Sequence, residues 1–584
     1  MPQVIAVITF WSIAMCFSIP GFSTPPLPQD ALPGVINGNN SQPWAIPNRE
    51  KENDPNPSNR VPQVLPSDSQ TPVIIDKQEK PDFSEEQLRI PVKTIQLEGA
   101  TLLPIKLIAP ILKRYEGDND LSFAEMQKLA DELTQVYIRA GYLNSRIYLP
   151  PQDFQNGVLV LRAVEVTVQS ITLENNKWFL PKAVLPQIGL KAGDFFNVKP
   201  LESGVRFVND NPDLRLAAIL EKGDQPGTTK VILKPQAHFP VHPTLFWDNL
   251  GRDSIGRSRF GISTVDNNFL GFGDTNTNSV NFTDTSTGVI DQYRLPIGHW
   301  GTQLGFDYSY SHLKVRGALK DLHIQSTSHI FSPSITQPLI RTERTGLTLN
   351  LAFDFKNLKT YVLEQPFYRD RLSILRSGFQ GYHYDWHGRT LFDQEFAVGL
   401  PLFSGTVGNS SLASKAGSGT KFFRASGSVT RIQQLPKEVV GLVRVRYQLS
   451  PNRLIGAEQT QSGGAFSVRG YFEGQYLGDN GFSLSNEYYF PSYLIPRKWR
   501  LPGMKEPLRS AVRWVGFTDF GHVFVNHVNS SEARNKTLLS AGFGVRVSLT
   551  QRVVLRLDAG FPLLKPGNLE SRPRLHFALQ STLF

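Results

Sequence analysis

The fold is decided by residues 347–355, which read Leu347-Thr348-Leu349-Asn350-Leu351-Ala352-Phe353-Asp354-Phe355. Apolar side chains occupy every second position, which is the period of a β-strand with one apolar face. The same alternation occurs at 304–310, 443–449 and 553–559, and in the last two stretches the opposite face carries full charges. The sequence therefore predicts a mostly β region of antiparallel strands that extends to the C-terminus.

Such alternation fits either a soluble β-sandwich or a transmembrane β-barrel, and the barrel is favoured. The region holds about 345 residues. At roughly 20 residues per strand and turn this gives on the order of 16 strands, more than a sandwich normally uses. Charged polar faces suit a wet lumen, and a closed sheet leaves no unpaired edge in lipid. We therefore expect residues 238–584 to form an outer-membrane β-barrel, and the chain ends in Phe584 as many such barrels do.

The composition agrees with a membrane barrel and argues against other classes. The 584 residues include 38 Phe, 17 Tyr and 47 Gly, and only 19% are charged, less than soluble proteins usually carry. The net charge is +10, but no basic run is interleaved with aromatic residues, so we expect no nucleic acid partner. The one cysteine, Cys16, excludes a disulfide framework and a multi-cysteine metal site.

The N-terminal 89 residues contain two segments that differ in composition. Residues 1–23 read as a signal peptide, because an apolar run over 4–17 precedes small residues at Gly21 and Ser23. The alternative is an N-terminal membrane anchor, since no Lys or Arg comes before the apolar run. Residues 24–89 carry 12 prolines and are expected to form an extended, mobile, Pro-rich linker.

Residues 90–166 and 167–237 predict two small α/β domains, each with the order β-α-α-β-β. In the first, a helix opens at Ser122, with Glu125 three residues on to complete a capping box. Gly141 stands where that helix needs a C-terminal cap. The other expected elements are strands at 92–97, 144–149, 158–164, 168–173, 214–221 and 229–235, and helices at 105–115, 181–188 and 200–209. Both domains resemble POTRA domains, the periplasmic modules that receive polypeptides.

Two charges in the barrel region require an explanation. Arg469 lies on a glycine-flanked loop within the motif Val468-Arg469-Gly470-Tyr471, and Asp519 lies in mid-strand within the motif Phe517-Thr518-Asp519-Phe520-Gly521. Such charges are costly in apolar surroundings unless they meet each other or water. Alternation along the strand places Trp514 toward lipid and Asp519 toward the lumen. We therefore predict that the loop folds into the barrel and that Arg469 binds Asp519, with Glu487 as a further acceptor.

Two interpretations of this predicted pair remain open. In the first, the loop motif (Val468, Arg469, Gly470 and Tyr471) and the wall motif (Phe517, Asp519 and Gly521) form a latch that is exchanged during transport. In the second, the pair is a fixed salt bridge that only holds the barrel together.

These motifs resemble those of the two-partner secretion transporters (TpsB family, the haemolysin secretion/activation proteins), which are related more distantly to the barrel-assembly protein BamA. The similarity covers about residues 90–584. The remaining motifs follow the family's order: Arg139–Tyr142, Leu149–Asp153, Gly157, Asp248–Gly251, Asn268–Asp274, Gly463–Gly464, Gly478–Asp479 and Leu484–Glu487.

The resemblance implies a sixteen-stranded barrel in the outer membrane of a Gram-negative cell, with two POTRA domains in the periplasm. Such a protein carries one large exoprotein, an adhesin or haemolysin, outward across the membrane. Outer-membrane lipid and lipopolysaccharide surround the barrel. Members often have an N-terminal plug helix, but the prolines of residues 24–89 argue against one here. No nucleotide is available in the periplasm, so we expect no hydrolysis to drive transport. The sequence contains no Walker, G-x-S-x-G or H-E-x-x-H motif, and we therefore expect no enzyme activity, catalytic residue, cofactor or metal.

Three other functions share features with this sequence. An outer-membrane β-barrel assembly or insertion factor uses the same loop and strand motifs and is the main alternative. A passive porin needs no POTRA domains, so residues 90–237 argue against it. A hydrolase fused to a barrel needs a nucleophile motif, which is absent from the sequence.

Overall fold

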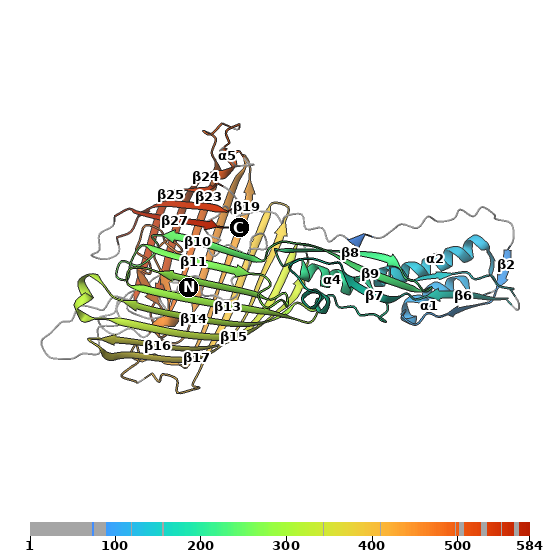
Figure 1. The fold of residues 1–584 in the computed structure, drawn as a ribbon, viewed down its shortest axis with the longest axis horizontal. Helices are drawn as coiled ribbons and strands as arrows, with labels where there is room; N and C mark the ends of the chain where they lie inside the picture. Colours follow the sequence, from blue (N-terminus) through green and yellow to red (C-terminus); the bar gives the residue numbers. More distant parts are fainter. Residues whose placement is uncertain are drawn as a thin grey trace, which may run out of the picture.

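The computed structural model describes residues 73–74, 89–117, 119–154, 157–342, 344–408, 410–496, 498–500, 507–526, 534–549, 552–565 and 572–583. The predicted signal peptide, nearly all of the predicted linker and Phe584 lie outside the described residues. Two parts are visible in Figure 1: a β-barrel, and an elongated arm of helices and small sheets that extends from one end of it.

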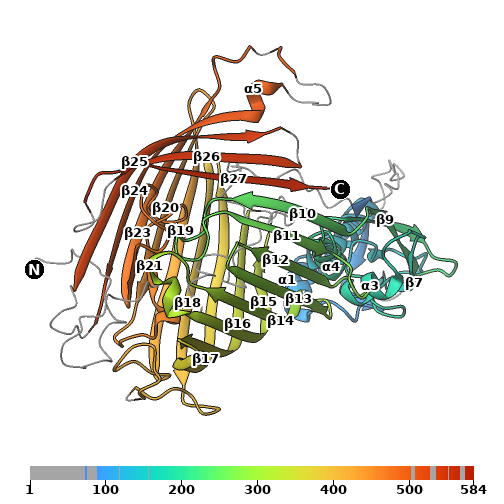
Figure 2. The ribbon, with the colours of Figure 1, turned by 60° about the vertical axis from the view of Figure 1, so that its left-hand side comes forward.

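The barrel contains sixteen strands, and every neighbouring pair is antiparallel, which confirms the predicted strand number and architecture. Consecutive strands pair in chain order, and the first strand pairs with the last, Thr244 opposite Thr582, so that no edge is left (Figure 2). The strands are β10 (Val241–Asp248), β11 (Arg259–Asp266), β12 (Thr275–Phe282), β13 (Ser286–Ile297), β14 (Thr302–Lys314), β15 (Gln325–Arg341), β16 (Thr345–Val362), β17 (Gln365–Asp385), β18 (Gly388–Leu400), β19 (Phe422–Leu435), β20 (Val439–Leu449), β23 (Asn480–Pro491), β24 (Val512–Phe524), β25 (Asn535–Ser548), β26 (Val553–Pro562) and β27 (Arg574–Thr582).

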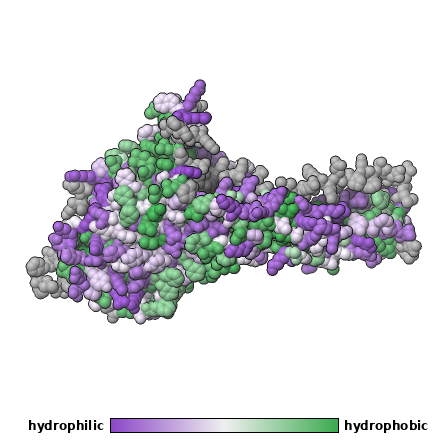
Figure 3. Space-filling view, in the orientation of Figure 1, coloured by the Kyte–Doolittle hydropathy of each residue, from purple (hydrophilic) through white to green (hydrophobic). Residues whose placement is uncertain are grey.

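The alternation in the sequence becomes an inside-out distribution of side chains. In β16, Leu351 exposes 45% of its surface, whereas Asn350 exposes 3% and Asp354 none. Apolar side chains therefore stand on the outer wall, where lipid replaces water, and polar side chains line the lumen. Figure 3 shows hydrophobic side chains exposed on the outer wall of the barrel.

The outer half of the arm is an α/β unit with a three-stranded sheet, ordered β3-β6-β5, beside a β2–β4 pair. Its elements are β2 (Arg89–Val92), β3 (Thr94–Glu98), α1 (Ile105–Tyr115), β4 (Asn119–Ser122), α2 (Phe123–Ala140), β5 (Arg146–Tyr148) and β6 (Val158–Val164). The predicted capping box forms between Ser122 and Glu125, and Gly141 ends α2 in the left-handed conformation with φ 103°. The predicted order lacked β4, because a four-residue polar strand has no apolar alternation.

The inner half of the arm is a second α/β unit, with a sheet ordered β1-β8-β9-β7. Its elements are β1 (Val73–Ile74), β7 (Thr167–Leu173), α3 (Pro181–Val184), the 3₁₀ helix η4 (Leu185–Gln187), α4 (Val198–Val208), β8 (Leu214–Lys222) and β9 (Thr228–Ala237). Helix α4 begins two residues before the predicted start at Pro200, because the Asn197 side chain accepts from the backbone N–H of Lys199 and Pro200 needs no partner in a first turn. Strand β1 comes from the predicted linker and pairs in parallel with β8.

The inner unit is fixed to the near end of the barrel, which we call the arm-side rim. Asp213 of the arm lies 2.8 Å from His242 Nε2 and accepts a hydrogen bond from Asn267 at 2.7 Å. Arg341 at the end of β15 forms an ion pair with Asp210 and lies over the ring of Phe207. The arm is therefore held to the rim by both charged and aromatic contacts. No helix in the described residues is long and apolar enough to span a membrane.

Candidate functional site

The candidate site is the segment 450–479, which joins β20 to β23 and is folded back into the barrel; we call it the lumenal loop. It contains the 3₁₀ helix η6 (Gly456–Glu458) and a small hairpin of β21 (Thr460–Ser462) and β22 (Tyr476–Gly478). Between these two strands lie Val468, Arg469 and Tyr471, each at most 3% exposed. The motif predicted from sequence therefore occupies the lumen, not the outer surface.

The loop approaches the barrel wall where neither backbone carries a side chain. Gly470 has φ +91°, and a Cβ atom there would lie 2.9 Å from the carbonyl group of Gly560 in β26. A Cβ on Gly560 would lie 2.4 Å from the backbone nitrogen of Gly470. Both positions therefore require glycine, for conformation at Gly470 and for space at both. The Gly470 N–H also donates to His576 Nε2 at 3.3 Å.

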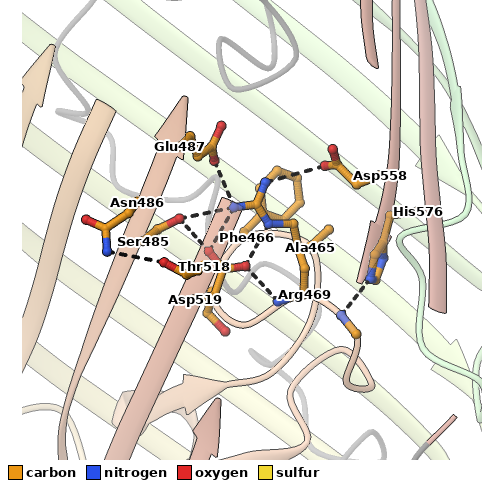
Figure 4. Close-up of polar contacts among 12 residues, drawn as sticks. Ala465, Phe466, Arg469, Ser485, Asn486, Glu487, Thr518, Asp519, Asp558 and His576 are labelled. Atoms are coloured by element: carbon orange, nitrogen blue, oxygen red, sulfur yellow. Dashed lines mark hydrogen bonds and ion pairs between the residues drawn. The ribbon is translucent and has the colours of Figure 1, made fainter. Parts of the chain in front are cut away.

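Arg469 and Asp519 form a bidentate ion pair in the lumen (Figure 4). Arg469 Nε lies 2.7 Å from Asp519 Oδ2, and Nη2 lies 2.8 Å from Oδ1. The backbone N–H of Arg469 also donates to Asp519 Oδ2, at 3.1 Å. Ser485 donates to Asp519 Oδ1 at 2.6 Å, and the guanidinium lies 3.5 Å from the ring centroid of Phe517. Planar, two-point contact of this kind fixes direction as well as distance.

Further carboxylates complete the surroundings of Arg469. Glu487 in β23 lies 3.1 Å from Nη2, and Asp558 in β26 lies 3.6 Å from Nη1. Burial disfavours the charged guanidinium, but the nearby carboxylates, Asp519 first, hold the pKa of Arg469 above its usual value. The group therefore stays charged, and the loop residue contacts carboxylates from three different strands.

The charges of this cluster are balanced. Asp558 accepts from Arg546 Nη1 at 2.7 Å and from Arg556 Nε at 2.7 Å. Three guanidinium groups thus face three carboxylates, and such buried groups are tolerated because each has a partner of opposite sign. The sequence did not point to Asp558, Arg546, Arg556 or His576 as site residues, and Ser485 was named only within the motif Leu484–Glu487, with no role. The polar faces of their strands were a signal that they line the lumen, but not that they reach Arg469.

The remaining residues of the loop motif also bind the barrel wall. Val468 packs with Tyr476, Val523 and Leu538, and the Tyr471 hydroxyl lies 2.8 and 2.7 Å from the carbonyl oxygens of Leu539 and Leu564. These contacts tie the loop to β25 and to the end of β26.

Gly521 in β24 makes room for the loop. A Cβ there would lie 2.2 Å from Ser462 Oγ and 2.5 Å from a methyl carbon of Val468. Phe517 and Asp519 are buried, whereas Trp514 on the opposite face is 46% exposed. The structure thus brings all the predicted motif residues into one contact region.

A second set of ion pairs holds the other part of the loop. Glu458 in η6 is 1% exposed and accepts from Lys356 Nζ at 2.6 Å and from Arg424 Nη1 at 2.6 Å. Arg424 also binds Glu395 at 2.5 Å. These partners lie on β16, β18 and β19, whereas Asp519 lies on β24. The lumenal loop is therefore anchored to two separate parts of the barrel wall.

Asp479 closes the base of the loop. Its Oδ1 accepts from the backbone N–H of Leu454 at 2.9 Å and from Gln459 Nε2 at 2.8 Å, and Lys415 lies 3.4 Å away. One buried carboxylate thus joins both ends of the loop to the neighbouring segment 401–421. Neither Glu458 nor Asp479 was predicted as a site residue.

Comparison with known proteins places these features in a family. The model for haemolysin secretion/activation protein ShlB/FhaC/HecB matches residues 227–547, and the ShlB-type POTRA domain matches residues 90–165. The outer membrane transporter CdiB of Dickeya dadantii (strain 3937) is 25% identical over 459 residues, 76% of this chain and 78% of the relative. The heme/hemopexin transporter protein HuxB of Haemophilus influenzae (strain 86-028NP) is 24% identical over 432 residues, 70% of this chain and 74% of the relative.

Solved structures agree with the fold. CdiB from Escherichia coli superposes with a TM-score of 0.66 at 23% identity, covering 86% of this chain and 93% of that one. BamA from Haemophilus ducreyi lacking POTRA domains 1–3 gives a TM-score of 0.51 at 13% identity, covering 85% and 100%. Because the family model matches more than half of the residues, the chain belongs to the haemolysin secretion/activation protein family.

Proposed function

We propose that this chain is an outer-membrane polypeptide transporter that carries an unfolded exoprotein through its barrel. The barrel lies in the outer membrane and the arm in the periplasm, as in the family's transporters. Residues 90–166 and 167–237 serve as two POTRA domains, residues 238–584 as the pore, and residues 1–23 as the export signal. The cargo is a large secreted protein of the adhesin or haemolysin kind, and nucleic acid has no part in the process.

The observation that carries the proposal is that a charged loop, and not a packed core, fills the lumen. A barrel of sixteen strands has channel width only where nothing fills it. The lumenal loop is held there by Arg469 and Glu458, whose contacts are ion pairs and hydrogen bonds that other polar groups can replace. Exchange of such contacts needs neither a catalytic residue nor a nucleotide.

The arm supports the first step, capture of the cargo. Unfolded polypeptide has free N–H and C=O groups, and β5 lies at an edge of its sheet. An extended cargo segment can add to such an edge as a further strand, with main-chain hydrogen bonds supplying affinity. The captured chain then passes the arm-side rim and displaces the lumenal loop, so that Arg469 and Asp519 act as a latch.

A reversible covalent lock tests the latch. A Cβ built on Gly521 would lie 3.6 Å from the Cβ of Ser462, which is within the range of disulfides. We expect the double variant Ser462→Cys/Gly521→Cys, in a Cys16→Ser/Val468→Ala background, to block secretion when oxidised and to restore it on reduction. Val468→Ala removes the methyl carbon that would lie 2.5 Å from a Cβ at position 521. The cargo is first identified as the exoprotein that reaches the medium only when this chain is expressed. The two single-cysteine variants are the matched controls, and barrel abundance in the membrane is measured throughout.

Two outcomes contradict different parts of the proposal. Normal secretion by the oxidised double variant would show that the lumenal loop does not move. If loss of the chain left every exoprotein in the medium unchanged and reduced the amount of other outer-membrane barrels, the chain would be an assembly factor instead.

A further inference from the structure

The turn between β23 and β24, residues 492–511, differs from the other turns of the arm-side rim. It has 20 residues, whereas the turns at 267–274, 298–301, 386–387 and 436–438 have two to eight. The described part comprises residues 492–496, 498–500 and 507–511, with α5 (Leu508–Ala511) at its end. In Figure 1 it projects beyond the strands it joins. A turn of this length is not needed to connect neighbouring antiparallel strands.

The turn exposes large apolar side chains that continue the lipid-facing wall. Leu494 is 91% exposed, Trp499 62% and Tyr493 54%. Phe490 and Trp514 stand opposite each other at the adjoining strand ends and are 41% and 46% exposed on the outer wall. Exposed apolar side chains thus occur on the barrel wall and also in the turn that leaves it, and exposed apolar side chains gathered in this way mark a contact with another apolar phase.

The same turn is strongly basic. Its sequence has one acidic residue, Glu506, against five basic ones: Arg497, Lys498, Arg500, Lys505 and Arg509. Lys498 and Arg500 are exposed, and Arg509 lies 4.9 Å from the ring centroid of Tyr493. In the described residues, one of these charges, that of Arg509, therefore stands directly beside an aromatic side chain.

Contacts with the rim fix the turn in place. The Tyr493 hydroxyl donates to the carbonyl oxygen of Lys437 at 2.5 Å, and Ser492 Oγ donates to the carbonyl oxygen of Val512 at 2.9 Å. The backbone N–H of Leu508 donates to the carbonyl oxygen of Trp499 at 2.8 Å. The apolar and basic side chains are thus presented from a held backbone.

We propose that the described residues of 492–511 form an interfacial anchor that binds anionic phospholipid in the periplasmic leaflet of the outer membrane. Aromatic side chains favour the boundary between hydrocarbon and headgroups, and basic side chains favour anionic headgroups. The turn leaves the lipid-facing wall at Phe490 and Trp514, and its exposed side chains combine aromatic Tyr493 and Trp499 with basic Lys498 and Arg500, as such a boundary favours. The anchor fixes β23 and β24, the strands that carry Glu487 and Asp519. It rests on the membrane location and not on the transport function.

Depth-dependent quenching tests the anchor on the full chain. Leu494→Cys in a Cys16→Ser background is labelled with the fluorophore NBD and reconstituted in nanodiscs of phosphatidylcholine, with or without phosphatidylglycerol and with brominated acyl chains. The matched control is Ile105→Cys on α1 of the arm, which is also apolar and 76% exposed. We expect about twofold or greater quenching at position 494 and none at 105, with more quenching when phosphatidylglycerol is present. The substitutions Lys498→Gln and Arg500→Gln should abolish that lipid dependence and leave the quenching in phosphatidylcholine.

Three results would overturn the proposal. If the NBD groups at positions 494 and 105 show the same emission and the same quenching, the turn lies in water and does not contact the membrane. Quenching at 494 that ignores phosphatidylglycerol, or that retains its dependence in the Gln variants, would refute recognition of anionic headgroups. If the NBD group at position 494 is protected from water only when a periplasmic extract is added, the surface binds a protein and not lipid.

Discussion

Replacing Arg469 with alanine should release the lumenal loop from β24. The substitution removes two side-chain hydrogen bonds to Asp519, of 2.7 and 2.8 Å, and the 3.1 Å contact with Glu487. Removal of one partner from a buried ion pair costs about 3–5 kcal/mol, because the other partner is left without compensation. At about 1.4 kcal/mol per factor of ten, the population of released loop should rise by about two to three and a half orders of magnitude.

A buried thiol measures that population. Ser462 in β21 is 1% exposed, so the reporter Ser462→Cys is modified by a maleimide only when the loop leaves the wall. When opening is fast relative to modification, the labelling rate follows the open population. The matched control is Arg431→Ala, which removes a partly exposed pair with Asp385 on another part of the barrel. Such pairs contribute about 0–1 kcal/mol, so the control should change the rate less than about fivefold.

A double-mutant cycle decides whether Arg469 acts through Asp519. Each single variant, Arg469→Ala and Asp519→Ala, should raise the labelling rate, and the double variant should raise it little further, because the same contact is already lost. If the two effects instead multiply, or if Arg469→Ala changes the rate less than fivefold, the pair does not hold the loop.

Two further predictions use the same reporter. Burial raises the pKa of Glu473 to about 7, although the Ala465 N–H favours its ionised form. The loop in its place on the wall therefore prefers the protonated acid, and this position should lose stability as the pH rises from about 4.5 to 7. The labelling rate, relative to a free-thiol reference, should increase over that range, and Glu473→Gln should remove the increase. A labelling rate that falls as the pH rises would contradict this assignment. Glu458→Ala leaves Lys356 and Arg424 without this carboxylate and should also raise the labelling rate. In the double variant with Arg469→Ala the two rate increases should multiply, because the two sets of ion pairs share no residue. If they do not multiply, the two sets open together and not independently.

Local chemistry made much of the fold predictable. Ser122, Glu125 and Gly141 define both ends of α2, because caps act over a few residues. The barrel was predicted from the alternation of apolar and polar residues, which is a property of each strand by itself. The contact between Arg469 and Asp519 was expected because each charge needed a partner and the phase of β24 placed Asp519 in the lumen.

The unpredicted features depend on long-range geometry. Alternation shows that Lys356 and Asp558 line the lumen, but not which strands stand opposite after closure of the barrel. Glu458 reaches its partners through a short 3₁₀ helix that has no periodic signal. Strand β4 is short and polar, and strand β1 has only two residues far from the other elements in the sequence. Each forms only because a neighbouring strand is there to pair with.

The approach of Gly470 to Gly560 has a mechanical consequence. At that point the loop meets the wall backbone to backbone, and no rotamer has to change when they separate or meet again. Side chains in ordinary packed contacts must find their interlocking arrangement each time. If the loop leaves the wall as proposed, this one contact can be broken and made again without that search, and the side chains that must find their arrangement are those around it, among them Val468 and Arg469.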